Sequence, residues 1–125
     1  KAVSLLADGV RDGAAARAQL QWALDNAGSD VIRETARLRL VRVLIAEGKY
    51  ADAEAMINQA EASEAFEPLY RELRGDIHFA RGDTASARAE YEHALAAMTP
   101  DMPERQLVQL KYDNAAMPEA GGAGE

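Results

Sequence analysis

The spacing of apolar residues along the chain predicts α-helices joined by short turns. Leu69, Tyr70, Leu73 and Ile77 recur at intervals of three and four positions, and similar stripes precede and follow them. This is the period at which side chains line one face of a helix. Valine, isoleucine and threonine are sparse and never alternate with polar residues over several positions. Because alternation is the mark of a strand, we predict an all-α protein.

Single glycines, prolines and capping residues divide the chain into helices. We expect Gly9 to end a short first helix and Asp12 to cap a second one, which ends near Gly28. Pro68 is suited to a helix's first turn, where its missing N–H costs nothing. Asp101 is read as the first residue of a capping box. Helices are then expected at about 30–47, 51–62, 68–81, 84–98 and 101–115.

Two of the predicted helix hairpins match each other at a fixed spacing. Four pairs of positions lie 34 residues apart: Gly48 and Gly82, Ala53 and Ala87, Ile57 and Tyr91, Ala60 and Ala94. This period, with small residues where two helices cross and a large one that packs on the next unit, is that of the tetratricopeptide repeat, and Gly75 matches its small residue in the first helix. The chain resembles that repeat, and an unrelated helical bundle is the alternative.

The repeat predicts how the domain is organised. We expect one tetratricopeptide-like domain over residues 1–116, a right-handed superhelix of antiparallel helix hairpins with repeats at about 1–28, 29–63 and 66–99. A C-terminal capping helix at about 101–115 would cover the open end of the stack with Leu107, Val108, Leu110 and Tyr112. The tail 117–125 has little to bury, so we expect it to be disordered.

Composition and motifs argue against several classes of function. Fourteen lysines and arginines against 21 acidic residues give a net charge of -7, and no basic cluster stands apart, so nucleic acid is not an expected partner. Cysteine is absent, which excludes disulfides and thiolate sites. His78 and His93 lack acidic neighbours at a metal-ligand spacing, and no nucleophile or phosphate-loop motif occurs. We expect no metal, no cofactor and no enzymatic activity.

Several segments together resemble one family more closely. They include Leu73–Asp76, the Gly82–Asp83 turn and the stretch Gln109–Asn114. Over most of its length the chain resembles the YfgM family, which are ancillary subunits of the bacterial Sec translocon. The resemblance implies a periplasm-facing domain tethered to the inner membrane by one helix, with translocon subunits and a periplasmic chaperone as partners. The chain has no sufficiently long apolar span, so we expect it to be the soluble part, with the membrane segment outside it.

The repeat also predicts a peptide-binding groove. In such stacks the first helices line a concave face, where apolar residues beside charges of both signs suit a peptide segment. An acidic Asp76 would repel a carboxylate, which argues against the clamp that chaperone cofactors of this repeat class use. Leu38 and Ile45 have a competing interpretation as core residues. The candidate groove residues are Leu5, Leu38, Arg42, Ile45, Glu72, Asp76 and Phe79.

We therefore carry two hypotheses for the function. The first is an interaction module at the Sec translocon that helps exported chains reach periplasmic chaperones. The alternative is a self-assembling or scaffolding tetratricopeptide protein of another envelope complex.

Overall fold

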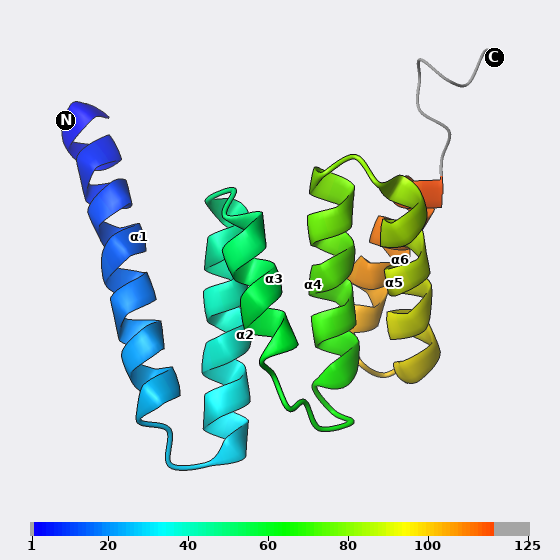
Figure 1. Cartoon of the computed structure of the whole chain (residues 1–125). Helices are drawn as coiled ribbons and strands as arrows, with labels where there is room; N and C mark the ends of the chain where they lie inside the picture. Colours follow the sequence, from blue (N-terminus) through cyan, green and yellow to red (C-terminus); the bar gives the residue numbers. More distant parts are fainter. Residues whose placement is uncertain (1, 117–125) are drawn as a thin grey trace. The chain divides into compact units, whose positions relative to one another are not determined.

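The structure, a computed structural model, describes residues 2–116 and the side chains of residues 13–116. All regular structure in this part of the chain is helical, which confirms the all-α prediction (Figure 1). The helices α1–α3 form one compact unit and α4–α6 another. No helix among the described residues is long and apolar enough to cross a bilayer. The bounds are α1 Ala2–Asp25, α2 Asp30–Ala46, α3 Tyr50–Asn58, α4 Glu67–Ala80, α5 Thr84–Ala97 and α6 Pro103–Ala116.

The first unit begins with one long helix. The prediction that Gly9 ends a helix and that Asp12 caps the next was wrong, because α1 continues through both positions. A glycine inside a helix costs only about 1 kcal/mol relative to alanine. The alanine-rich sequence that follows Gly13 has the highest intrinsic helix propensity, which favours continuation over a break.

The hairpin of α2 and α3 begins and turns where the sequence indicates. Ser29 caps α2, because its hydroxyl accepts a hydrogen bond from the amide of Ile32 at 3.2 Å. Gly48 has φ +77°, the left-handed conformation expected of a glycine that ends a helix. Helix α3 ends at Asn58, before the predicted residue 62, so Ala60 lies beyond it. The Ala60 amide bonds the Ile57 carbonyl three residues earlier, the tighter geometry common at helix ends.

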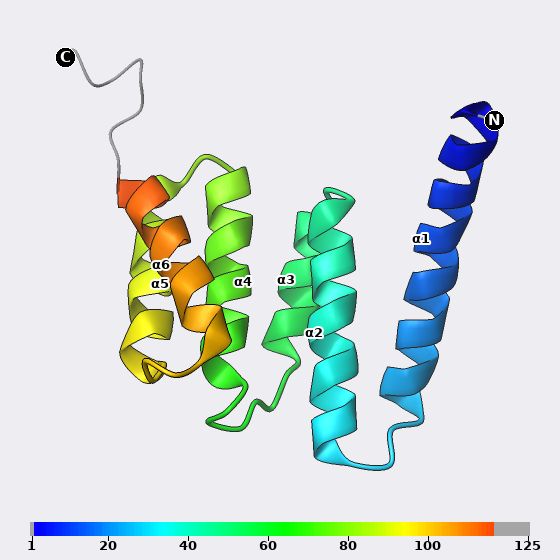
Figure 2. The ribbon, with the colours of Figure 1, turned by 180° about the vertical axis from the view of Figure 1, so that it is seen from behind.

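The second unit contains the better-preserved repeat. Pro68 lies in the first turn of α4, and Gly82 has φ +85° in the turn before α5. Asp83 caps α5 by accepting a hydrogen bond from the Ser86 amide at 3.1 Å. These observations confirm the predicted helix and turn. In the view from behind, α6 lies in front of α5, and the two helices are in contact (Figure 2).

Gly75 allows α4 and α5 to approach each other closely. A methyl group at Gly75 would lie 2.4 Å from Cε1 of Tyr91, so the aromatic ring occupies the space that any other side chain would need. The Tyr91 hydroxyl donates a hydrogen bond to Asp76 at 2.7 Å. Tyr91 thus packs on its own hairpin, and it shares a buried cluster with Val108 of α6 as well.

Helix α6 differs in part from the prediction. It begins at Pro103, and Asp101 instead accepts a hydrogen bond from Thr99, which lowers the pKa of its carboxyl group. The structure therefore does not show the predicted capping box. Val108 is buried as expected, but Leu107 and Leu110 were wrongly predicted to cover the core: Leu110 is 62% exposed.

An ion cluster connects α6 to the hairpin. The Lys111 ammonium donates to Glu72 at 2.7 Å and to Asp76 at 2.9 Å, and Asp76 also accepts the Tyr91 hydroxyl. We call these four residues the Lys111 cluster. Glu72 is only 3% exposed, so its charge depends on Lys111 for compensation. One lysine from α6 thus satisfies two carboxylates of α4.

The contact between Gly75 and Tyr91 predicts a loss of stability on adding one methyl group. Overpacking costs about 1–3 kcal/mol, and the better helix propensity of alanine returns about 1 kcal/mol. Gly75→Ala should therefore lower the free energy of unfolding by up to about 2 kcal/mol in urea denaturation. Gly13→Ala is the control, because its methyl group would meet only the Glu47 carboxylate at 3.4 Å. That control should be neutral or stabilising, and equal effects of the two variants would contradict the close contact.

The buried Glu72 charge predicts a second effect. Lys111→Met removes the compensating charge and should cost about 3 kcal/mol in urea denaturation, near the lower end for a broken buried pair. The double variant Lys111→Met/Glu72→Gln removes the stranded charge and should recover a large part of that loss. Lys49→Met serves as control, because Lys49 lies 3.8 Å from Glu47 at an exposed site. A Lys111→Met protein as stable as the control would show that the cluster contributes little.

The Lys111 cluster also predicts alkaline sensitivity. Burial, and then the hydrogen bond to Asp76, raise the pKa of Tyr91. Burial opposes the charge on Lys111, but its hydrogen bonds to Glu72 and Asp76 outweigh this and raise its pKa too. Both groups hold their protons more tightly when folded, so this stability is complete below their unfolded pKa values of about 10 and is lost as pH rises above them. Above pH 10 the melting temperature of wild type should decrease more steeply with pH than that of Tyr91→Phe/Lys111→Met.

Candidate functional site

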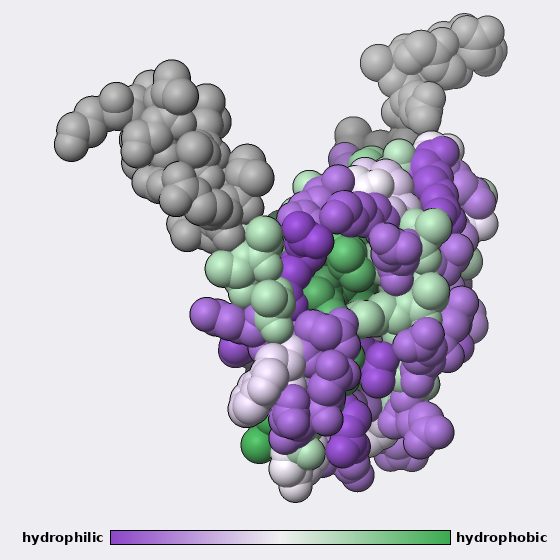
Figure 3. Space-filling model, turned by 60° about the vertical axis from the view of Figure 1, so that its left-hand side comes forward, coloured by the Kyte–Doolittle hydropathy of each residue, from purple (hydrophilic) through white to green (hydrophobic). Residues whose placement is uncertain are grey.

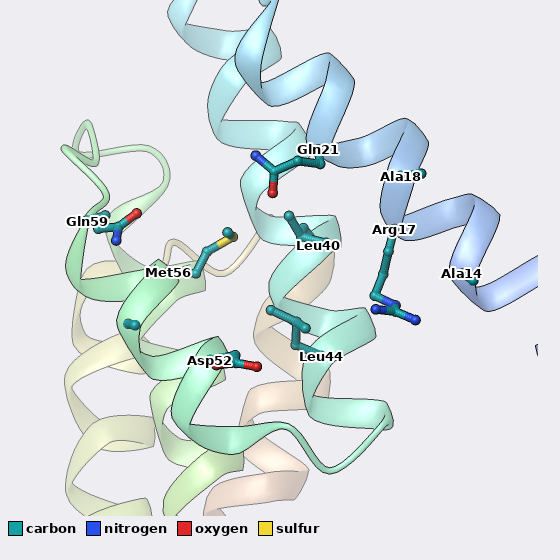
Figure 4. Close-up of a pocket in the computed structure, with 10 residues that line it drawn as sticks. Ala14, Arg17, Ala18, Gln21, Leu40, Leu44, Asp52, Met56 and Gln59 are labelled. Carbon is teal, nitrogen blue, oxygen red and sulfur yellow. The ribbon is translucent and has the colours of Figure 1, made fainter.

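An open groove of the first unit lies between α1 and α3, with α2 as its floor. Its volume is about 550 Å³. In the space-filling view a hollow with a hydrophobic interior is bordered by hydrophilic residues (Figure 3). Figure 4 shows Leu40 and Leu44 between the side chains of α1 and those of α3. The lining residues are Ala14, Arg17, Ala18, Gln21, Leu40, Leu44, Asp52, Ala55, Met56 and Gln59.

The groove exists because small residues face its floor. Leu40 and Leu44 are one helical turn apart on α2 and both belong to the core. Ala14 and Ala18 border them on α1, one turn apart, and Ala55 borders them on α3. An alanine cannot reach across to fill the space above the two leucines. The floor is therefore apolar, while the surface above it stays open.

The rim of the groove is polar and carries charges of both signs. Arg17 Nε lies 3.1 Å from Glu47 Oε1, although this contact is not aligned as a hydrogen bond. Gln21 donates to Asp25 at 2.9 Å. The side chain of Asp52, on the α3 side, makes no ion pair or hydrogen bond with another residue of the described part of the chain. A bound segment could therefore place apolar side chains on the floor and polar groups along the rim.

The chemistry of the lining favours binding over catalysis. Its titratable side chains are Arg17 and Asp52, and it contains no histidine, cysteine, serine or threonine. No nucleophile is thus placed beside a general base, the minimum that hydrolytic chemistry needs. Apolar floor, polar rim and open shape are instead the features of a surface that accepts a peptide segment.

The predicted groove residues of the first unit lie elsewhere on α2. Leu38 is 4% exposed and belongs to the core, as its alternative interpretation had it. Ile45 is half-buried and Arg42 is exposed. Leu40 and Leu44 lie on a different side of the helix from these residues, since each step along it turns the side chain by about 100°. The side chain of Leu5 lies outside the described residues.

The predicted groove residues of the second unit have internal contacts. Glu72 and Asp76 both belong to the Lys111 cluster, and only Phe79 of the three is exposed. Variants of Asp76 would disturb the fold, so they cannot report on binding. A groove that combines residues of both units stays a prediction.

One sequence signal could have indicated the observed groove. Ala14 and Ala18 stand at helical spacing on α1, where small residues permit either close packing or open space. The predicted break at Gly9 and Asp12 is incompatible with α1 as one continuous side of the groove. Which interpretation of the alanines holds depends on the distance between α1 and α3, which no local pattern encodes.

Comparison with known proteins gives consistent results. The family model of the tetratricopeptide repeat-like domain matches residues 6–117. The chain is 33% identical over 99 residues to the ancillary SecYEG translocon subunit of Neisseria gonorrhoeae, covering 79% of this chain and 47% of that protein. The proteins of the same name from Haemophilus influenzae and Escherichia coli are 31% and 29% identical over 104 and 103 residues, covering 83% and 82% of this chain.

These matches confirm the resemblance found in the sequence. The shares of the relatives covered are 47%, 50% and 48%, so the chain spans about half the length of the curated relatives that it matches. No solved structure matches it. Because the family model covers nearly all of the described helices, the chain belongs to the tetratricopeptide repeat-like domain family.

Proposed function

We propose that the domain is the protein-interaction module of an ancillary Sec translocon subunit that links exported proteins to periplasmic chaperones. In this proposal a segment outside the chain anchors the protein in the bacterial inner membrane, and the domain faces the periplasm. Support comes from the relatives that are named ancillary SecYEG translocon subunits. The observation that carries the proposal is the apolar groove of the first unit, which is built for binding and holds no catalytic pair.

The groove suits a transient complex with an emerging polypeptide. An unfolded exported chain presents apolar side chains that the floor formed by Leu40 and Leu44 can cover. The open shape and the exposed alanines of the rim limit the contact area, and small interfaces of this kind are typically weak and reversible. Rapid release is what a protein that passes chains onward requires, and affinity differences arise mainly from dissociation rates.

A second candidate function is self-assembly or scaffolding in another envelope complex. Leu107 and Leu110 favour it, because both are large apolar residues exposed on α6. Sedimentation of wild type and of Leu107→Ser/Leu110→Ser would separate the two functions. A wild-type oligomer that the variant loses would support self-assembly, and a monomer at high concentration would argue against it.

The proposed function predicts a specific effect of filling the groove. Ala18 is exposed and borders the floor, so Ala18→Trp should occupy the space above Leu40 without disturbing the core. In the full-length protein in membranes, we expect this variant to reduce crosslinking to a translocating polypeptide several-fold. Ala15→Trp is the matched control, an exposed alanine of the same helix that does not line the groove.

The same membranes test the two parts of the proposal separately. Wild type and both variants should co-purify with translocon subunits or with a periplasmic chaperone, since filling the groove leaves other surfaces intact. Recovery of neither partner with wild type would reject the translocon function. Equal crosslinking by Ala18→Trp and Ala15→Trp would reject the groove as the polypeptide site.

A further inference from the structure

A second, smaller pocket lies on a different face of the α1 and α2 pair. We call it the Arg39 pocket. It has a volume of about 220 Å³, and the surface of its lining is mostly apolar. Its lining residues are Leu20, Ala23, Val31, Ile32, Thr35, Ala36 and Arg39, all within the first unit.

Two of these residues expose far more apolar surface than the fold requires. Val31 is 63% exposed and Ile32 53%, although both are β-branched residues in the first turn of α2. Such residues have lower helix propensity than glutamate or glutamine, which suit an exposed first turn. They contribute little to the core, so only a bound partner would bury them. The apolar lining supplies one half of a recognition site.

Arg39 supplies the other half. It is exposed and is the one charged residue of the lining. Its guanidinium has no ion pair or hydrogen bond within the described part of the chain. Asp30 does not neutralise it, because it lies more than two helical turns away on α2 and pairs with Arg33 at 2.6 Å. Thr35 lies one turn before Arg39, so its hydroxyl and the guanidinium border the same side of the pocket. Both groups can donate hydrogen bonds to one carboxylate.

The size of the pocket limits what can enter it. Sites for drug-sized ligands and cofactors usually enclose about 300–1,000 Å³, which is more than this pocket offers. One bulky side chain fits that space better than a whole small molecule. An unpaired guanidinium at the edge then selects a negative group next to that side chain.

We propose that the Arg39 pocket binds a polypeptide segment in which a bulky aliphatic or aromatic residue stands next to an aspartate, a glutamate or a chain-terminal carboxylate. The apolar side chain contacts Val31 and Ile32, and the carboxylate pairs with Arg39 and Thr35. This inference rests on the proposed interaction function, and it adds a second binding site with its own chemical preference.

A defined peptide set tests the proposal with the 125-residue chain. Each peptide is a decamer of glycine and serine that carries leucine, phenylalanine or alanine next to aspartate, asparagine or lysine. Amide NMR titration detects even millimolar binding and reports on the amides of residues 35 and 39. We expect the leucine–aspartate and phenylalanine–aspartate peptides to bind roughly five-fold more tightly than their lysine counterparts, the size of one exposed ion pair.

Charge reversal provides the decisive comparison. Arg39→Glu should invert the preference, so that the lysine peptides bind more tightly than the aspartate peptides. Arg88→Glu is the control, an exposed arginine of α5 that does not line the pocket, and it should leave the order unchanged. Ile32→Ser should reduce the preference for leucine and phenylalanine over alanine.

Three outcomes would overturn the proposal. The first is the absence of shifts at residues 35 and 39 with every peptide, and the second is an Arg39→Glu protein with the wild-type preference. The third is a wild-type oligomer that Ile32→Ser dissociates without any peptide preference, which would make the pocket a contact between copies. The titration needs no translocon, so its failure is distinguishable from a failure of co-purification in membranes.

Discussion

Both units depend on helices that approach each other closely where the side chain is a methyl group or a hydrogen atom. Ala53 of α3 is fully buried in the first unit, and Ala87 and Ala94 of α5 are fully buried in the second unit. At Gly75 the approach is closer still, because the ring of Tyr91 occupies the position of a β-carbon. This contact also places the Tyr91 hydroxyl against Asp76, so the polar cluster of the second unit is a consequence of close packing. The small residues therefore determine where both the apolar and the charged side chains lie.

The two units use their polar residues in different ways. In the second unit, Lys111 satisfies Glu72 and Asp76, so these acidic side chains are occupied within the fold. In the first unit, small residues border Leu40 and Leu44 without covering them, and Asp52 on the rim has no partner among the described residues. A buried charge whose partner is fixed adds specificity to the fold but offers little to a ligand. The open apolar floor with polar groups around it is therefore the feature that supports an interaction function.

Local and periodic features were predictable from the sequence, whereas contacts between distant residues were not. The spacing of 34 residues, the left-handed Gly48 and Gly82 and the cap at Asp83 follow from residue types at fixed offsets, and the structure has all of them. Glu72 and Asp76 were assigned to a binding surface because the first helices of such repeats line a concave face, but the repeat pattern cannot reveal that Lys111 contacts them. The groove was not predicted for a related reason. Alanines at helical spacing are compatible with close packing or with open space, and the distance between the helices decides which of the two occurs.

The two pockets of the first unit differ in the charged side chains that a bound segment would meet. The net charge of -7 would repel acidic segments at long range. At physiological salt, however, screening makes this repulsion weak beyond the Debye length of about 8–10 Å. At contact distance the local group decides, and Arg39 is a cation without a partner among the described residues, whereas Arg17 at the larger groove is already close to Glu47. In the proposed function the larger groove would bind mainly by apolar burial, with Asp52 as the charged side chain on its rim that has no partner among the described residues. The unpaired side chain of the Arg39 pocket is a cation instead, so the two proposed sites would favour segments of opposite charge.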